Sequence, residues 1–204
     1  MGTDDCLFQN YVRAPVAFTH GRGVKLWDAS GREYLDFLAG IAVSSLGHAH
    51  PRLTKALSLQ VERYLHVSNL YRIPEQETAA RLLVEASRSV GRGLDRVFFC
   101  NSGTEANEAA IKMARKRGSS RGAYEIIVMH NGFHGRTLGS LAATGTARYH
   151  EGFGPLPEGF CFVTFNDLDE AAAAVTDKTA AILVEPIQGE GGVIPPSDGY
   201  LEGL

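Results

Sequence analysis

The sequence predicts an α/β fold, in which an N-terminal antiparallel segment precedes part of a mainly parallel sheet with flanking helices. Three observations predict it. Residues 24–37 alternate around a turn, two amphipathic stretches follow prolines, and from residue 96 onward short apolar runs alternate with helical patterns. With 204 residues, of which 44% are hydrophobic, the chain is long enough to bury a sizeable core.

The N-terminal elements are predicted from turn and proline signals. Apolar and polar residues alternate on both sides of an Asp-Ala-Ser-Gly run at 28–31, which indicates a β-hairpin over residues 24–37. Pro51 and Pro74 each open a stretch with apolar residues at helical spacing, because proline is favoured in the first turn of a helix. We expect both helices to cover a core, since neither has the basic face of a membrane-binding helix.

The second part of the chain is predicted to form parallel strands. Four short runs are apolar on both faces, as in a parallel sheet that is covered on both sides: residues 96–100, 125–129, 160–165 and 180–185. Asp167 and Glu170 can cap the alanine-rich helix that follows the third run. Ligands of such sheets bind at the carboxyl ends of the strands, so the loops after Cys100, Met129 and Glu185 are the candidate site.

Composition and charge exclude several classes of partner. The net charge of -3 provides no basic field for nucleic acid or for an anionic membrane surface. No run approaches the roughly 20 apolar residues of a membrane span. Cys6, Cys100 and Cys161 are widely spaced, and the last two lie in apolar runs, which indicates reduced core thiols. We therefore expect a cytoplasmic protein that binds neither nucleic acid nor membrane.

The first loop has the features of a phosphate-binding helix start. Ser102 and Glu105 have the spacing of a capping box, and Gly103 leaves room for a ligand to approach the backbone. The first N–H groups of a helix lack intrahelical acceptors and attract anions. A plain helix cap is the favoured explanation when this loop is considered alone, and the glycine patterns of nucleotide-binding loops are absent from this sequence.

The second loop, residues 130–137, contains an aromatic ring and a cation. Phe133 can stack on a flat heteroaromatic ligand or can plug a local core, and Arg136 can bind a carboxylate or form a surface ion pair. His130 and His134 lie four residues apart, but the glycines between and after them argue against the helix that would direct both to one metal ion.

The third loop adds two carboxylates in a glycine-rich segment. Glu185 and Glu190 can orient a cofactor, pair with a substrate-binding arginine, or remain solvated loop acids. Together the three loops predict a pocket for a phosphorylated aromatic cofactor and an amino-acid-like substrate.

Several motifs resemble one enzyme family. Residues 101–108, 132–138 and 184–192 resemble the class III aminotransferases, which use pyridoxal 5'-phosphate on the fold-type I scaffold. Residues 34–43 and 46–51 also fit that family, and residues 66–71 are similar to its acetylornithine aminotransferase branch. The resemblance runs along essentially the whole chain. It implies that residues 1–50 belong to the family's small domain and that residues 51–204 form an incomplete cofactor-binding large domain.

The resemblance also implies roles for individual residues. Ser102, Gly103 and Thr104 would hold the cofactor phosphate, Phe133 would stack on the pyridine ring, and Arg136 would bind the substrate carboxylate farthest from the reacting amine. Glu190 resembles an acid that neutralises a second, glutamate-binding arginine while the diamino substrate is present. Glu185 would support the pocket from behind.

The reaction implied by the resemblance moves the terminal amine of N2-acetylornithine to 2-oxoglutarate, a step of arginine biosynthesis, in a homodimer. The family's Schiff-base lysine and its pyridinium-binding aspartate have no counterpart motif here, so we expect an N-terminal portion that is inactive alone and has no catalytic residue of its own. Alternatives are related substrates, namely succinylornithine, ornithine, 4-aminobutyrate or an aminoadipate derivative, and a non-catalytic cofactor-binding module.

Overall fold

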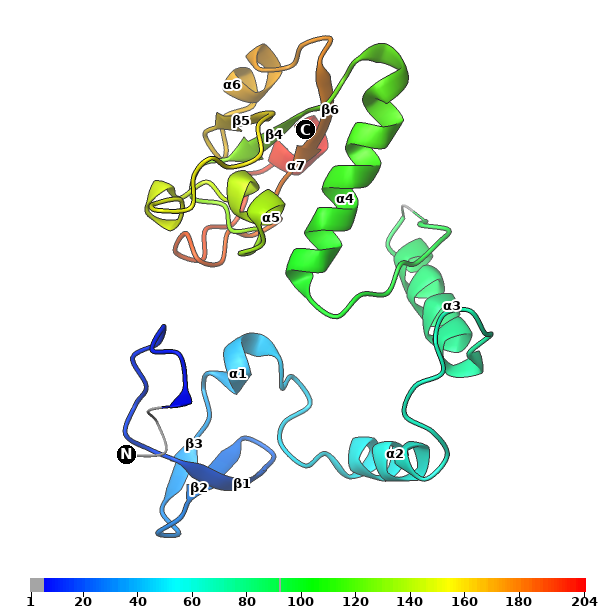
Figure 1. Cartoon of the computed structure of the whole chain (residues 1–204), viewed down its shortest axis with the longest axis vertical. Helices are drawn as coiled ribbons and strands as arrows, with labels where there is room; N and C mark the ends of the chain where they lie inside the picture. The colour runs from blue at the N-terminus through cyan, green and yellow to red at the C-terminus, as the bar shows by residue number, and fades with distance from the viewer. Residues whose placement is uncertain (1–5, 92) are drawn as a thin grey trace. The chain divides into compact units, whose positions relative to one another are not determined.

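The computed structural model describes residues 6–91 and 93–204, and it divides into two compact units, one up to Glu77 and one from Thr78 (Figure 1). The elements in chain order are β1 (Phe18–Arg22), β2 (Lys25–Asp28), β3 (Glu33–Leu35), α1 (Ala39–Ala42), α2 (Pro51–Val61), α3 (Pro74–Ser89), α4 (Gly103–Gly118), η2 (Ser119–Arg121), β4 (Glu125–Met129), α5 (Leu138–Ala143), η3 (Ala147–Tyr149), β5 (Phe160–Val163), α6 (Leu168–Ala173), β6 (Thr179–Leu183) and α7 (Tyr200–Gly203). The domain boundary predicted after residue 50 stays a prediction.

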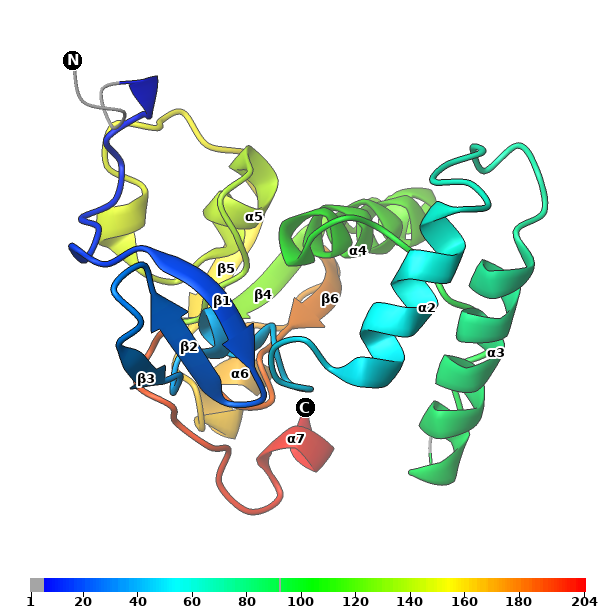
Figure 2. The ribbon, with the colours of Figure 1, turned by 90° about the horizontal axis from the view of Figure 1, so that it is seen from below.

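The first unit contains the antiparallel sheet β1-β2-β3, whose strands lie side by side in Figure 2. Its hairpin turn forms because the Asp28 carboxylate accepts the backbone N–H groups of Ser30, at 2.9 Å, and of Arg32, at 3.0 Å. The hairpin predicted over residues 24–37 is thereby confirmed.

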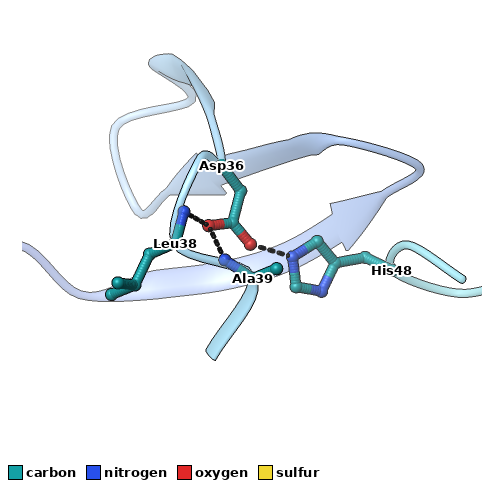
Figure 3. A network of polar contacts seen from close by, with 4 residues as sticks. All are labelled: Asp36, Leu38, Ala39 and His48. Atoms are coloured by element: carbon teal, nitrogen blue, oxygen red, sulfur yellow. Dashed lines mark hydrogen bonds and ion pairs between the residues drawn. The ribbon is translucent and has the colours of Figure 1, made fainter. Parts of the chain in front are cut away.

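A carboxylate and an imidazole hold the segment that follows the hairpin (Figure 3). Asp36 accepts the N–H groups of Leu38, at 3.1 Å, and Ala39, at 2.8 Å, and its second oxygen lies 2.7 Å from His48 Nε2. The segment between Asp36 and His48 includes α1, whose four residues all have positive φ, so α1 is a left-handed turn. Because left-handed conformations cost energy in residues other than glycine, this turn depends on its anchors.

The Asp36–His48 pair makes this turn sensitive to pH. The hydrogen bond from His48, together with those from the Ala39 and Leu38 backbone, lowers the pKa of the Asp36 carboxyl. A lowered pKa means that the pair stabilises the fold above the ordinary aspartate pKa of about 3.9, and that this contribution is lost as the pH falls through the lowered value. We expect His48→Ala to raise the pKa of Asp36 toward its ordinary value in a carboxyl-carbon NMR titration. An unchanged pKa would show that His48 is not the main cause.

Helices α2 and α3 begin at the prolines that predicted them. The expectation that they cover a core is wrong in this structure, because none of the residues of α2 or α3 is buried. Leu53, Leu57 and Val61 of α2 remain 46% to 60% exposed. None of the helices in the described part of the chain combines the length and the apolar composition that crossing a bilayer requires.

The second unit is built on a parallel sheet of order β5-β4-β6, as the apolar runs predicted (Figure 1). The central strand β4 is buried on both faces. Ile126 and Val128 pack with Ile111 of α4 and Ala143 of α5, whereas Ile127 and Met129 pack with Val163 of β5 and Ala171 of α6. Alternate side chains of a strand point to opposite faces, so α4 and α5 cover one face and α6 covers the other.

The strand predicted over residues 96–100 is wrong: these residues form no strand in the structure. An apolar run becomes a strand only where a neighbouring backbone supplies hydrogen-bond partners, and no described strand pairs with this run. Its side chains are correspondingly open, with Phe98 68% exposed, and Cys100 is exposed instead of lying in a core.

Candidate functional site

The N-terminus of α4 is capped from within its own first turn. The Ser102 hydroxyl accepts the Glu105 N–H at 3.3 Å, which confirms the serine half of the capping box. The Glu105 carboxylate accepts the N–H of Asn101, one residue before the N-cap, at 2.6 Å. The first N–H groups of a helix have no intrahelical acceptor, and this cap satisfies only that of Glu105, so the N–H groups of Gly103 and Thr104 have no acceptor among the described residues. A Cβ placed on Gly103 would meet no atom within 4 Å, so this end of the helix is open.

The second loop is fastened to α4. Asn107 Nδ2 donates to the His134 carbonyl at 2.6 Å, and the hydroxyl groups of Thr104 and Thr137 lie 2.9 Å apart. Gly135 has a φ of 128°, and a Cβ there would collide with the Thr104 side chain. Glycine is therefore required where the loop crosses the start of α4.

The third loop is fastened to the second by a carboxylate and an amide. Glu185 accepts the Phe133 N–H at 2.7 Å with one oxygen and the Gly189 N–H at 3.1 Å with the other. Gln188 is buried and donates from Nε2 to the His130 carbonyl at 2.8 Å. The start of α4 and the loops after β4 and β6 thus form one connected structure. The strand-end argument holds for the second and third loops. The residues before the first loop form no strand.

The predicted ligand-binding side chains lie on these connected loops but differ in exposure. Phe133 is half-buried, with the Tyr149 ring edge-on at 6.1 Å between centroids. Arg136 is exposed on the second loop and Glu190 is exposed on the third. The Thr104 hydroxyl lies against that of Thr137. The ligand-binding roles of Ser102, Gly103, Thr104, Phe133, Arg136 and Glu190 stay predictions.

His134 is the buried titratable group of the site. Its side chain is 5% exposed and its Nε2 has no hydrogen-bond partner among the described residues. Burial lowers the pKa of His134, against an opposing effect of the Glu185 carboxylate, which favours the charged ring. Burial therefore favours the neutral form of the His134 imidazole.

Sequence reasoning missed the residues that join the loops: Asn107, Glu108, Thr144 and Gln188. Glu108 bonds to the start of α5, and Thr144 accepts the His134 N–H at 3.0 Å. The partners through which they join the loops lie at least nine residues away in the chain, and as far as 58, so no local spacing identifies them. The one available signal was a polar residue on the apolar face of a predicted helix, as for Asn107.

A comparison with known protein families identifies the class of protein. Residues 8–204 match the model of the family described as Aminotransferase class-III. The chain therefore belongs to the class III aminotransferase family, as its motifs indicated.

Individual relatives agree with the family assignment. The acetylornithine aminotransferase of Methanocaldococcus jannaschii is 51% identical over 199 residues, which make up 96% of this chain and 49% of that protein. The crystal structure of ornithine aminotransferase from Toxoplasma gondii ME49 has a TM-score of 0.89 at 36% identity. The match covers 98% of this chain and 47% of the chain in that structure. The crystal structure of N-acetylornithine aminotransferase from Stenotrophomonas maltophilia K279a has a TM-score of 0.76 at 38% identity. The match covers 94% of this chain and 47% of the chain in that structure.

These likenesses confirm the predicted fold, which is part of the fold-type I aminotransferase scaffold. The chain spans about half the length of the curated relatives that it matches.

Proposed function

We propose that this chain is part of an aminotransferase that moves the terminal amine of N2-acetylornithine to 2-oxoglutarate, a step of arginine biosynthesis in the cytoplasm. The observation that carries the proposal is the 51% identity to an acetylornithine aminotransferase over 96% of the chain. The connected loops support it, because the segments that carry the N-terminus of α4, Phe133 and Arg136 are joined by hydrogen bonds.

The residues present fit pyridoxal 5'-phosphate as the cofactor. The open end of α4 offers the N–H groups of Gly103 and Thr104, together with the partial positive charge of a helix N-terminus, to a phosphate. The half-buried aromatic ring of Phe133 can stack on a pyridine ring. The Glu185 carboxylate accepts the Phe133 N–H and so holds the backbone that carries this ring. When bound, the cofactor supplies the electron sink for amine transfer, and the chain supplies orientation.

The acidic and basic groups of the second and third loops suit two carboxylate substrates. The Arg136 guanidinium can bind the α-carboxylate of N2-acetylornithine with two parallel hydrogen bonds. Glu190 lies on an exposed loop, where we assign it to neutralise a second arginine, which would bind 2-oxoglutarate in the homodimer.

The test of this function is a comparison of amine donors. In the protein produced together with any sequence that follows this chain in its reading frame, glutamate formation from 2-oxoglutarate should be faster with N2-acetylornithine than with ornithine, succinylornithine or 4-aminobutyrate. A preference for ornithine would move the protein to another branch of the family. A lack of glutamate formation with every donor would favour the non-catalytic cofactor-binding module.

Replacing Arg136 by alanine should weaken the binding of carboxylate substrates. The loss of hydrogen bonds to a charged group corresponds to a loss of affinity of about tenfold or more. The measurement is the Kd of N2-acetylornithine for the 204-residue chain, by isothermal titration calorimetry. Arg117→Ala, which removes an exposed arginine from the last turn of α4, is the control and should leave this Kd unchanged. Equal affinity in Arg136→Ala would remove Arg136 from the site.

A further inference from the structure

Helix α5 starts without a cap of its own. Thr137 is its N-cap residue, but its side chain caps no N–H group of the helix. The N–H groups of Gly139 and Ser140 instead donate to Oε1 of Glu108, at 3.0 and 3.1 Å, and the Thr137 hydroxyl bonds to the same oxygen. The cap of α5 is therefore a carboxylate of another helix, α4. A negative charge at this end also suits the helix dipole.

A second residue of α4 strengthens the contact. Thr104 and Glu108 are four residues apart, so they lie on the same face of α4. The Thr104 hydroxyl contacts that of Thr137, and the Ser140 hydroxyl donates to the Thr104 carbonyl at 3.1 Å. The first two turns of α4 are therefore joined to the first turn of α5 by hydrogen bonds.

The Glu108 carboxylate lies close to the backbone of α5. A Cβ on Gly139 would lie 2.6 Å from Glu108 Oε2, so the close approach of the carboxylate needs a glycine at that position. Glu108 is half-buried, so its hydrogen bonds are less exposed to competing water than those of a surface acid.

The hydrogen bonds of Thr137 to Glu108 and Thr104 hold the backbone next to Arg136. Arg136 directly precedes Thr137, and Thr104, one turn before Glu108 on α4, carries the N–H group that we assign to the cofactor phosphate. We propose that Glu108 is a positioning residue: through the start of α5 it sets the place of Arg136 relative to the phosphate-binding end of α4. This inference rests on the proposed function, in which Arg136 binds the substrate carboxylate.

The experiment separates carboxylate binding from phosphate binding in the 204-residue chain. Titrations followed by ¹⁵N NMR measure the Kd of N2-acetylornithine at the Arg136 Nε–H and the Kd of inorganic phosphate at the Gly103 N–H. We expect Glu108→Ala to raise the first Kd about tenfold, the equivalent of a lost helix cap, and to leave the second within about twofold. Glu108→Gln keeps an acceptor oxygen in place and should therefore fall between the wild type and Glu108→Ala.

The control is Glu170→Gln, because Glu170 also accepts a backbone N–H, that of Thr164, but belongs to α6. It should change neither Kd. A purely structural role of Glu108 would lower the unfolding midpoint without a selective loss of N2-acetylornithine binding, and that result would overturn the proposal. If Glu108→Ala does not fold, the test rests on Glu108→Gln. A wild-type Kd of N2-acetylornithine in Glu108→Gln would then overturn the proposal. If the wild-type chain binds phosphate but not N2-acetylornithine, the assigned role of Arg136 fails first, and this inference fails with it.

Discussion

Replacing Gly145 by alanine is expected to destabilise the second unit more than any other change proposed above. A Cβ at residue 145 would lie 2.8 Å from both the Asn131 nitrogen and the His130 Cα, and it would also collide with the Met129 carbonyl oxygen. These are backbone atoms at the end of the buried strand β4, so they cannot move aside cheaply. Overpacking of this kind costs about 1–3 kcal/mol, and more where the backbone cannot yield. Urea unfolding measures the free energy directly.

Gly103→Ala is the matched control for this substitution. A Cβ at residue 103 would meet no atom within 4 Å, so the free energy of unfolding should change by no more than about 0.5 kcal/mol. The same methyl group would occupy the space in which a phosphate approaches α4, so phosphate binding should weaken. Equal stabilities of Gly145→Ala and the wild type would contradict the close packing of Gly145 against the second loop.

Replacing Glu185 by glutamine should loosen both the aromatic ring and the third loop. The carboxylate accepts one N–H group with each oxygen, from Phe133 and from Gly189, whereas a glutamine amide can accept with one oxygen only. One backbone N–H would then face an amide NH₂ group, at a cost of roughly 1–3 kcal/mol if it stays buried. We expect a lower free energy of unfolding and faster amide hydrogen exchange at Phe133 or Gly189.

Glu190→Gln is the matched control, because Glu190 is an exposed glutamate of the same loop. It should leave the free energy of unfolding and the exchange rate at Phe133 unchanged. If Glu185→Gln exchanged no faster than Glu190→Gln at both amides, the carboxylate could not be what holds the second and third loops together.

Prediction from the sequence succeeded where the signal was local. The turn at Asp28, the cap at Ser102 and the prolines at the starts of α2 and α3 each depend on atoms within a few residues. It failed where an element needed a distant partner. Residues 96–100 have the composition of a strand, yet none of the described strands pairs with them. Likewise, none of the described residues of α2 and α3 is buried, although both helices have apolar residues at helical spacing.

The sequence by itself therefore determined the class of fold and most of its longer elements, and it predicted the three loops that the structure joins. It did so because hydrophobic periodicity, turn chemistry and capping act between neighbours in the chain. The tertiary structure alone decided how the loops are held: Glu108 bonds to Thr137, 29 residues away, and Gln188 to His130, 58 residues away. Such contacts depend on how the sheet brings separate strand ends together, and no spacing in the sequence records that distance.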